Sequence, residues 1–162
     1  MNLSSIAHEE RALPPLWDDN GFNTERVEWY TALVVNHSHH WGGRDVIAEF
    51  IAVMMLEAGL DNLNLGNNAK NGSDNPYIGI GWCQLDTGYH ASTVQMIHDL
   101  RNDPTIALDY IVATSDLAYV GTERVWLNES RWHAWNAERI DPTDGSWSPL
   151  ATCLDAYDKV TA

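Results

Sequence analysis

The stretch from Asp45 to Ala58 constrains the fold of this chain more than any other part of the sequence. Its apolar residues do not follow one stripe of a helix but cover most of the circumference: Val46, Ile47, Phe50, Ile51, Val53 and Met54. A helix that is apolar on all sides is usually buried at the centre of a domain. Gly59 follows directly and suits the left-handed residue that commonly ends a helix. We therefore expect a central, buried helix over residues 45–58.

The remaining segments predict further helices and one small β element. Residues 1–23 predict an irregular arm or a short helix followed by a turn, and glycines at 79 and 81 predict a β-hairpin over residues 77–85. Further helices are expected at 24–36, from Ser92 or Thr93 to Leu100, from Pro104 to Gly121, from Thr122 through Trp135, and from Pro149 onward. The predicted fold class is mainly α (α+β): one domain over residues 1–162, with a helical bundle around the central helix.

The composition describes a globular and strongly acidic protein. The chain has 162 residues, and its 23 acidic against 9 basic residues give a net charge of −14. That charge argues against nucleic-acid binding, which needs a basic patch, and against attraction to anionic membranes. The N-terminus lacks a basic region followed by an apolar one, and Glu49 interrupts the longest near-apolar stretch. We therefore expect no signal peptide, no membrane insertion and a protein made soluble in the cytoplasm.

Metal and redox chemistry find little support in the sequence. His37, His39 and His40 lie in one short break, but no cysteine or acid stands at a recognised ligand spacing from them. Cys83 and Cys153 fit two buried, reduced thiols, with a bridge between them as the alternative. We expect no metal and no cofactor.

Glu57 is the first candidate for chemistry because it closes the apolar run of the central helix. A carboxyl group shielded by apolar side chains keeps its proton and can act as a general acid. The alternative is an ordinary solvated glutamate on the last helical turn. Hydrolysis of a glycosidic bond needs such an acid together with a second carboxylate in a wetter loop or hairpin. Asp86, at the end of the Gly-rich strand, is a candidate for that second group.

Short motifs continue from this glutamate toward the C-terminus. A polar loop follows, then Gly-Ile-Gly-Trp-Cys-Gln-Leu-Asp-Thr-Gly-Tyr-His at residues 79–90, and later His-Ala-Trp-Asn-Ala at 133–137. This order resembles the lysozyme-like superfamily, and most of all its goose-type lysozymes and the related soluble lytic transglycosylases. In those families a Gly-Leu-Met-Gln-Val-Asp-like hairpin precedes Tyr-His, and an Ala-Tyr-Asn-Ala-Gly element lines the cleft. The resemblance covers roughly residues 44–137, and its motifs are short.

The resemblance implies a role for each matching residue. Glu57 takes the place of the catalytic acid, Asp86 that of the hairpin aspartate and Asp74 that of the loop aspartate. In an inverting enzyme the carboxyl groups lie about 6.5–9.5 Å apart, which leaves room for a water. From the residues alone, both aspartates are also ordinary turn formers. The implied substrate-binding residues are Gln84, which would also brace the hairpin, and Tyr89, His90, Trp82, Trp135 and Asn136.

The eight tryptophans bear on the same interpretation. Indole faces stack on the apolar faces of sugar rings. We expect Trp82 and Trp135 near the cleft, and we expect the core to contain Trp17, Trp29, Trp126 and Trp132. The chain departs from the family at three places: alanine follows Glu57, Trp82-Cys83 replaces Leu-Met, and Trp135 replaces a tyrosine with no glycine after Ala137.

The function implied is a peptidoglycan-degrading glycoside hydrolase, a muramidase that cleaves the β-1,4 bond between N-acetylmuramic acid and N-acetylglucosamine. One alternative is a lytic transglycosylase, in which the glutamate serves as acid and base and a 1,6-anhydro product forms. Another is a non-catalytic glycan-binding or virion structural protein of the same fold. We expect a monomer whose partner is peptidoglycan and which acts in phage lysis of the bacterial wall, released by a holin or carried in a virion.

Overall fold

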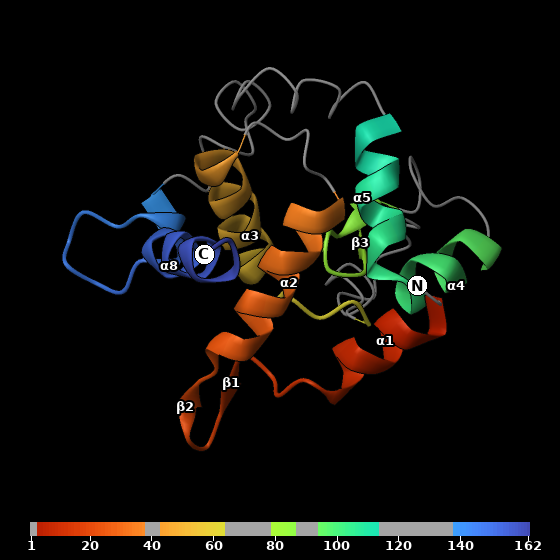
Figure 1. Cartoon of the computed structure of the whole chain (residues 1–162), viewed down its shortest axis with the longest axis horizontal. Coiled ribbons are helices and arrows are strands. Elements are labelled where there is room, and N and C mark those ends of the chain that lie inside the picture. The colour runs from red at the N-terminus through yellow and green to blue at the C-terminus, as the bar shows by residue number, and fades with distance from the viewer. Residues whose placement is uncertain (1–2, 38–42, 64–78, 87–93, 114–137) are drawn as a thin grey trace, which may run out of the picture.

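The protein is mainly helical, as the sequence predicts (Figure 1). The structure, a computed structural model, describes residues 3–37, 43–63, 79–86, 94–113 and 138–162. Within them the helices are α1 (Leu3–Ala12), α2 (Thr24–His37), α3 (Arg44–Ala58), α4 (Val94–Asn102), α5 (Pro104–Ala113) and α8 (Pro149–Val160). Two antiparallel hairpins accompany them: β1 (Trp17–Asp18) with β2 (Gly21–Phe22), and β3 (Gly79–Ile80) with β4 (Leu85–Asp86).

Helix α3 is the centre of the core. Every residue from Val46 to Met55 is buried, including Glu49. The helix ends at Gly59, which has a left-handed φ of 62° and donates its N–H to the carbonyl of Met55. Helices α2 and α8 pack against α3 and against each other, and Figure 1 shows α3 beside α8. The prediction of a central helix that ends at Gly59 is confirmed.

Two other helices begin where the sequence predicts. Asp103 precedes Pro104, and its carboxylate accepts the backbone N–H of Thr105 at 2.9 Å, so it caps α5. Ser148 precedes Pro149 and accepts the N–H of Ala151 at 3.1 Å, so it caps α8. The predicted end of α5 near residue 121 and the helix expected from Thr122 lie outside the described residues.

The N-terminal segment is a short helix followed by a turn, which was the second of the two predicted alternatives. Helix α1 buries Ile6, Ala7 and Glu10, and Leu16 belongs to the core cluster. The turn signal at residues 18–21 closes a second hairpin, in which Trp17 pairs with Phe22, that the sequence analysis did not predict. Strands of two residues carry no readable alternation of polar and apolar side chains, so periodicity does not reveal them.

A buried ion pair joins α1, α2 and the end of α3. The guanidinium of Arg26 on α2 is 2.9 Å from the Glu10 carboxylate, and both side chains are less than a tenth exposed. Arg26 also donates to the carbonyls of Leu13, Pro14 and Leu60. The Tyr30 hydroxyl donates to Glu10 at 2.9 Å, and burial together with that carboxylate raises the pKa of Tyr30. The partners of Arg26 in these bonds stand 12 to 34 positions away from it in the sequence.

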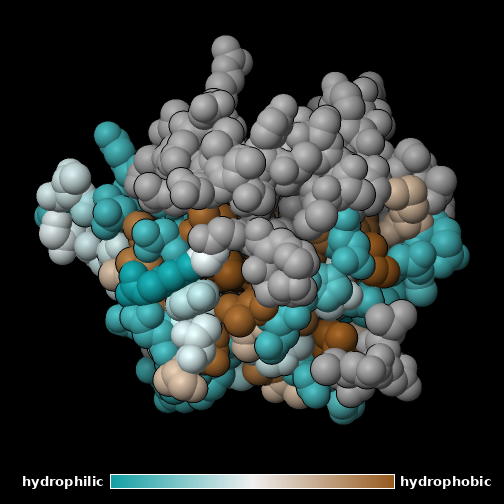
Figure 2. Space-filling view, turned by 45° about the horizontal axis from the view of Figure 1, so that its top comes forward, coloured by the Kyte–Doolittle hydropathy of each residue, from teal (hydrophilic) through white to brown (hydrophobic). Residues whose placement is uncertain are grey.

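On the face shown in Figure 2, hydrophilic residues predominate, with hydrophobic areas between them. In the part of the chain that the structure describes, no helix has the length and apolar character needed to cross a membrane.

Replacing Glu10 by alanine should destabilise the protein by about 3–5 kcal/mol, because the buried Arg26 guanidinium loses its carboxylate. Urea unfolding followed by circular dichroism measures this loss. Asp158→Asn is the control, since it weakens an exposed pair with Arg44 at 2.7 Å and should leave the unfolding midpoint almost unchanged. Equal shifts of the unfolding midpoint in the two variants would show that the buried Glu10–Arg26 pair stabilises the protein no more than the exposed pair does.

Candidate functional site

Glu57 lies on the last turn of α3, and its side chain is 26% exposed. An oxygen of its carboxylate is 4.0 Å from a guanidinium nitrogen of Arg139. The sequence predicted a carboxyl group enclosed by apolar side chains, and the structure corrects that environment. The apolar residues before Glu57 turn into the core, while Glu57 itself reaches toward water and a cation. Nothing in the local sequence points to Arg139, which comes from the distant C-terminal segment.

The chain turns sharply directly after this helix. Gly59 and Leu60 both have left-handed backbone angles, with φ of 62° and 50°. A leucine seldom adopts this conformation, so tertiary contacts must hold it there. The Leu60 side chain is fully buried, and its carbonyl accepts a hydrogen bond from Arg26 at 2.8 Å. The buried ion pair therefore fixes the direction in which the chain leaves α3.

Asn62 connects the segment after α3 to the β3–β4 hairpin. It is 1% exposed, its Oδ1 accepts the backbone N–H of Trp82 at 3.3 Å, and its Nδ2 donates to the carbonyl of Leu100 at 2.7 Å. Gly81 has a φ of +74°, and a Cβ there would lie 2.7 Å from Asn62 Oδ1. The hairpin turn can approach the end of α3 this closely only because residue 81 is glycine. Sequence reasoning missed Asn62, although its place between the apolar Leu60 and Leu63 was a signal for a buried amide.

Trp82 is a core residue, which corrects its predicted place near the cleft. Its side chain is fully buried between Tyr30 and Phe50, with ring centroids at 4.7 and 5.6 Å. Its indole N–H donates to the carbonyl of Pro104 at 3.0 Å. A ring enclosed in this way has no open face for a sugar. Trp82 instead fastens the hairpin to α2, α3 and α5.

The Trp82 contact also shows which side of α3 faces the hairpin. Phe50, which touches Trp82, stands seven positions before Glu57 on the same helix. Helix positions seven apart differ in direction by only about 20° and lie about 10 Å apart along the axis. Glu57 therefore points from α3 in nearly the same direction as Phe50, two turns further along the helix.

Gln84 and Asp86 lie on the hairpin itself. Gln84 has a positive φ of 50°, and its side-chain amide donates to the Gly81 carbonyl at 2.8 Å. Its predicted role in bracing the hairpin is confirmed. Asp86 pairs with Gly79 in the register of β3 and β4, so the predicted hairpin is present.

Several predicted site residues lie outside the part of the chain that the structure describes. These are Asp74, Tyr89, His90, Trp135 and Asn136. The separation of the Glu57 and Asp86 carboxyl groups stays a prediction.

The two cysteines are free thiols, as the first of the two sequence interpretations had it. Burial raises the pKa of both thiol groups. Cys153 on α8 is fully buried, with its Sγ 3.3 Å from the Met55 sulfur on α3. Cys83 follows Trp82 in the hairpin turn. Both are therefore packing residues rather than reactive groups.

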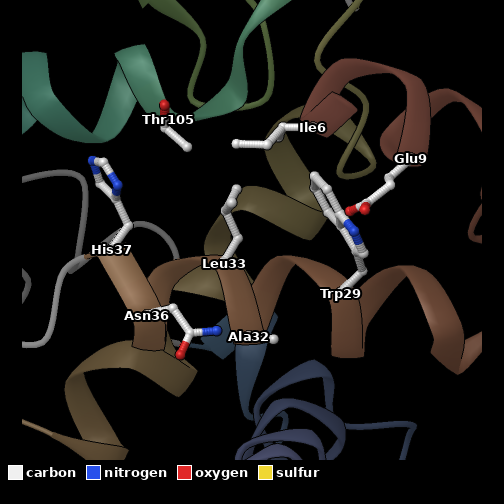
Figure 3. A pocket seen from close by; sticks show the side chains of 8 residues that line it. All are labelled: Ile6, Glu9, Trp29, Ala32, Leu33, Asn36, His37 and Thr105. Atoms are coloured by element: carbon white, nitrogen blue, oxygen red, sulfur yellow. The ribbon is translucent and has the colours of Figure 1, made fainter. Parts of the chain in front are cut away.

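A cavity of about 400 Å³ lies between α1, α2 and α5, apart from Glu57 (Figure 3). Ile6, Trp29 and Leu33 form its apolar wall, with His37 at one end. The His37 ring nitrogen is 2.6 Å from Asp109 on α5, in an exposed pair. Among the described residues no group of three potential metal ligands is present. The cavity joins no predicted site residue to another.

The comparisons with known proteins identify no relative. No protein family, curated protein or solved structure matches this chain. The assignment of function therefore depends on the residues and their arrangement alone.

Gly81→Ala should destabilise the protein more than Gly145→Ala, as measured by urea unfolding. Both glycines have positive φ, +74° and +84°, and alanine costs about 1–2 kcal/mol in such a conformation. At Gly145 nothing lies within 4 Å of the added Cβ, whereas at Gly81 it meets Asn62. We expect at least about 1 kcal/mol of additional loss for Gly81→Ala. Equal losses of stability in the two variants would mean that the Asn62 side chain moves away from the added methyl group without destabilising the protein.

Proposed function

We propose that this protein is a peptidoglycan-degrading glycoside hydrolase, a muramidase in which Glu57 is the catalytic acid. The observation that carries the proposal is the position of Glu57. It is a partly exposed carboxyl group at the end of a buried helix, two turns beyond Phe50, which contacts Trp82 of the β3–β4 turn. Glycosidic hydrolysis uses an acid together with a second carboxylate, and in this proposal Asp86 on β4 supplies the second one.

In the proposed reaction, one carboxyl group acts on the leaving oxygen and another acts on the attacking water. Glu57 gives its proton to the leaving oxygen, which breaks the bond between the anomeric carbon and that oxygen. Asp86, with Asp74 as the other candidate, takes a proton from the water that attacks the anomeric carbon from the opposite face. A guanidinium nitrogen of Arg139 lies 4.0 Å from the Glu57 carboxylate.

The rigidity of this site comes from its surroundings. The exit of α3 is fixed by Arg26 and the hairpin turn by Asn62 and Trp82, so neither side depends on a free loop. Precise placement of an acid relative to its substrate accounts for a large share of enzymatic rate enhancement. In this proposal the substrate is wall peptidoglycan, and a holin or a virion delivers the enzyme to it.

Glu57→Gln should abolish lysis of purified peptidoglycan, with at least a thousandfold loss of rate, because the amide has no proton to give at the leaving oxygen. A turbidity assay on purified cell walls measures the rate, and circular dichroism checks that the fold is intact. Asp158→Asn is the matched control, since it also removes one carboxylate from an arginine pair on a helix. Lysis at the wild-type rate by the Glu57→Gln protein would reject the assignment. A wild-type protein that binds walls without lysing them would instead be a glycan-binding protein.

The released fragments separate hydrolysis from transglycosylation. We expect muropeptides with reducing ends, because a water attacks the anomeric carbon. Mass spectrometry of the soluble products detects the alternative as 1,6-anhydro ends, which are lighter by one water. Predominantly anhydro products would make Glu57 both acid and base and leave the two aspartates without a catalytic role.

A further inference from the structure

Three aromatic rings from distant parts of the chain meet on the surface. Trp17 and Phe22 pair across the β1–β2 hairpin, and Trp147 comes from the segment before α8. Their centroids are 4.9, 5.1 and 5.7 Å apart. Trp17 is 60% and Trp147 45% exposed, more than any other large hydrophobic residue in the described ranges. The sequence analysis placed Trp17 in the core, and the structure corrects that. Neighbouring tryptophans that stay in water commonly mark a binding surface.

Hydrogen bonds hold these rings in place. The indole N–H of Trp147 donates to the Thr152 hydroxyl at 3.0 Å. Beneath the hairpin, the Asn23 side chain donates to the Pro15 carbonyl at 2.8 Å and to Asp18 at 2.9 Å. Binding therefore orders few groups that are free beforehand, which lowers its entropic cost.

A groove of about 220 Å³, lined by apolar as well as polar side chains, adjoins the rings. Phe22 and Thr152 belong to both, because they line the groove and also contact Trp147. The core residues Val27 and Ala156 line it as well. Its polar lining comes from two helices and includes a Glu28–Lys159 pair at 2.8 Å: Thr24, Glu28, Asp155 and Lys159.

We propose that the three rings and this groove form an accessory binding surface for a neutral glycan. A sugar ring has an apolar face, which suits an open indole, and hydroxyl groups, each of which both donates and accepts. The groove offers carboxylate and hydroxyl acceptors together with an ammonium donor. An apolar peptide or lipid would remove Asp155 and the Glu28–Lys159 pair from water without offering them hydrogen bonds. The net charge of −14 disfavours nucleic acid and other polyanions.

The surface is connected to the Glu57 site through the C-terminal segment. Ser148, next to Trp147, donates its hydroxyl to the Ile140 carbonyl at 3.1 Å, and Ile140 follows Arg139, the neighbour of Glu57. A polysaccharide held on the rings is thereby kept close to the enzyme while another part of it is cleaved. The choice of an N-acetylglucosamine polymer as the ligand rests on the proposed function, whereas the glycan-binding surface itself does not.

The test follows the indole N–H signals of Trp17 and Trp147 by NMR while chitohexaose is added to ¹⁵N-labelled Glu57→Gln protein. Trp17→Phe and Trp147→Phe assign the two signals. We expect both signals to shift together and to saturate.

In the Trp17→Ala variant, the chitohexaose concentration at the midpoint of the titration, read at Trp147, should rise at least tenfold. Asp155→Ala should raise it about fivefold through the loss of one hydrogen bond. Leu63→Ala removes an exposed apolar side chain that is not part of the cluster, and it should leave the midpoint within twofold.

The outcomes separate this inference from the proposed function. Unshifted Trp17 and Trp147 signals, or a midpoint that Trp17→Ala does not change, would overturn the glycan surface even if the wild-type protein lyses walls. Saturable shifts with the expected variant pattern would support the surface even if Glu57→Gln lyses walls as well as the wild type. Circular dichroism of each variant checks its fold, and thermal unfolding midpoints near that of the parent protein make the comparison valid.

Discussion

The buried guanidinium of Arg26 is the constraint on which the arrangement of the candidate site depends. A charge removed from water must find its partners inside the protein, and Arg26 finds them on three segments: Glu10 on α1, the carbonyls of Leu13 and Pro14 after it, and Leu60 beyond α3. Because the Leu60 carbonyl accepts a hydrogen bond from Arg26, Leu60 is held in its left-handed conformation. That turn brings Asn62 against Gly81, and Asn62 holds the hairpin. The relation of Glu57 to the hairpin thus follows from an ion pair that takes no part in the proposed chemistry.

The parts of the fold that the sequence predicts are those in which one local signal suffices. Helix α3 could be predicted because apolar residues surround it and Gly59 ends it, and α5 and α8 because Asp103-Pro104 and Ser148-Pro149 combine a cap with a proline. The ion pair could not be predicted in this way. Glu10 and Arg26 each stand in a helix where a charged residue would ordinarily face water, and only the packing of α1 on α2 encloses them. Local patterns therefore predict the helices, whereas the packing between helices depends on contacts between residues that are far apart in the sequence.

Two tryptophans show that local patterns do not predict which side chains are buried. Trp82 stands in the motif that suggests a sugar cleft, yet it is buried, because a carbonyl of α5 satisfies its N–H and two rings enclose its faces. Trp17 was expected in the core, yet it is exposed, because a hairpin of two-residue strands offers too little surface to cover an indole. Residue type predicts that an indole prefers an amphipathic setting, but the neighbours that provide this setting are set by the tertiary fold. The position of Glu57 could be predicted, because the end of a helix is a local property.

The acidic charge gives the exposed rings a physical rationale under the proposed function. A protein with a net charge of −14 gains no long-range attraction to an anionic bacterial wall, and it is repelled at low salt. Its retention on such a substrate must come from contacts that act at short range and that salt screens little. Indole stacking is of this kind, since it depends on surface contact and not on net charge. Glu28, Asp155 and Thr24, which line the groove, can accept hydrogen bonds from neutral hydroxyl groups, and such bonds are likewise compatible with the charge of the protein. A glycan backbone is the part of the wall that meets these conditions, so the acidic surface and the aromatic cluster are consistent with one substrate.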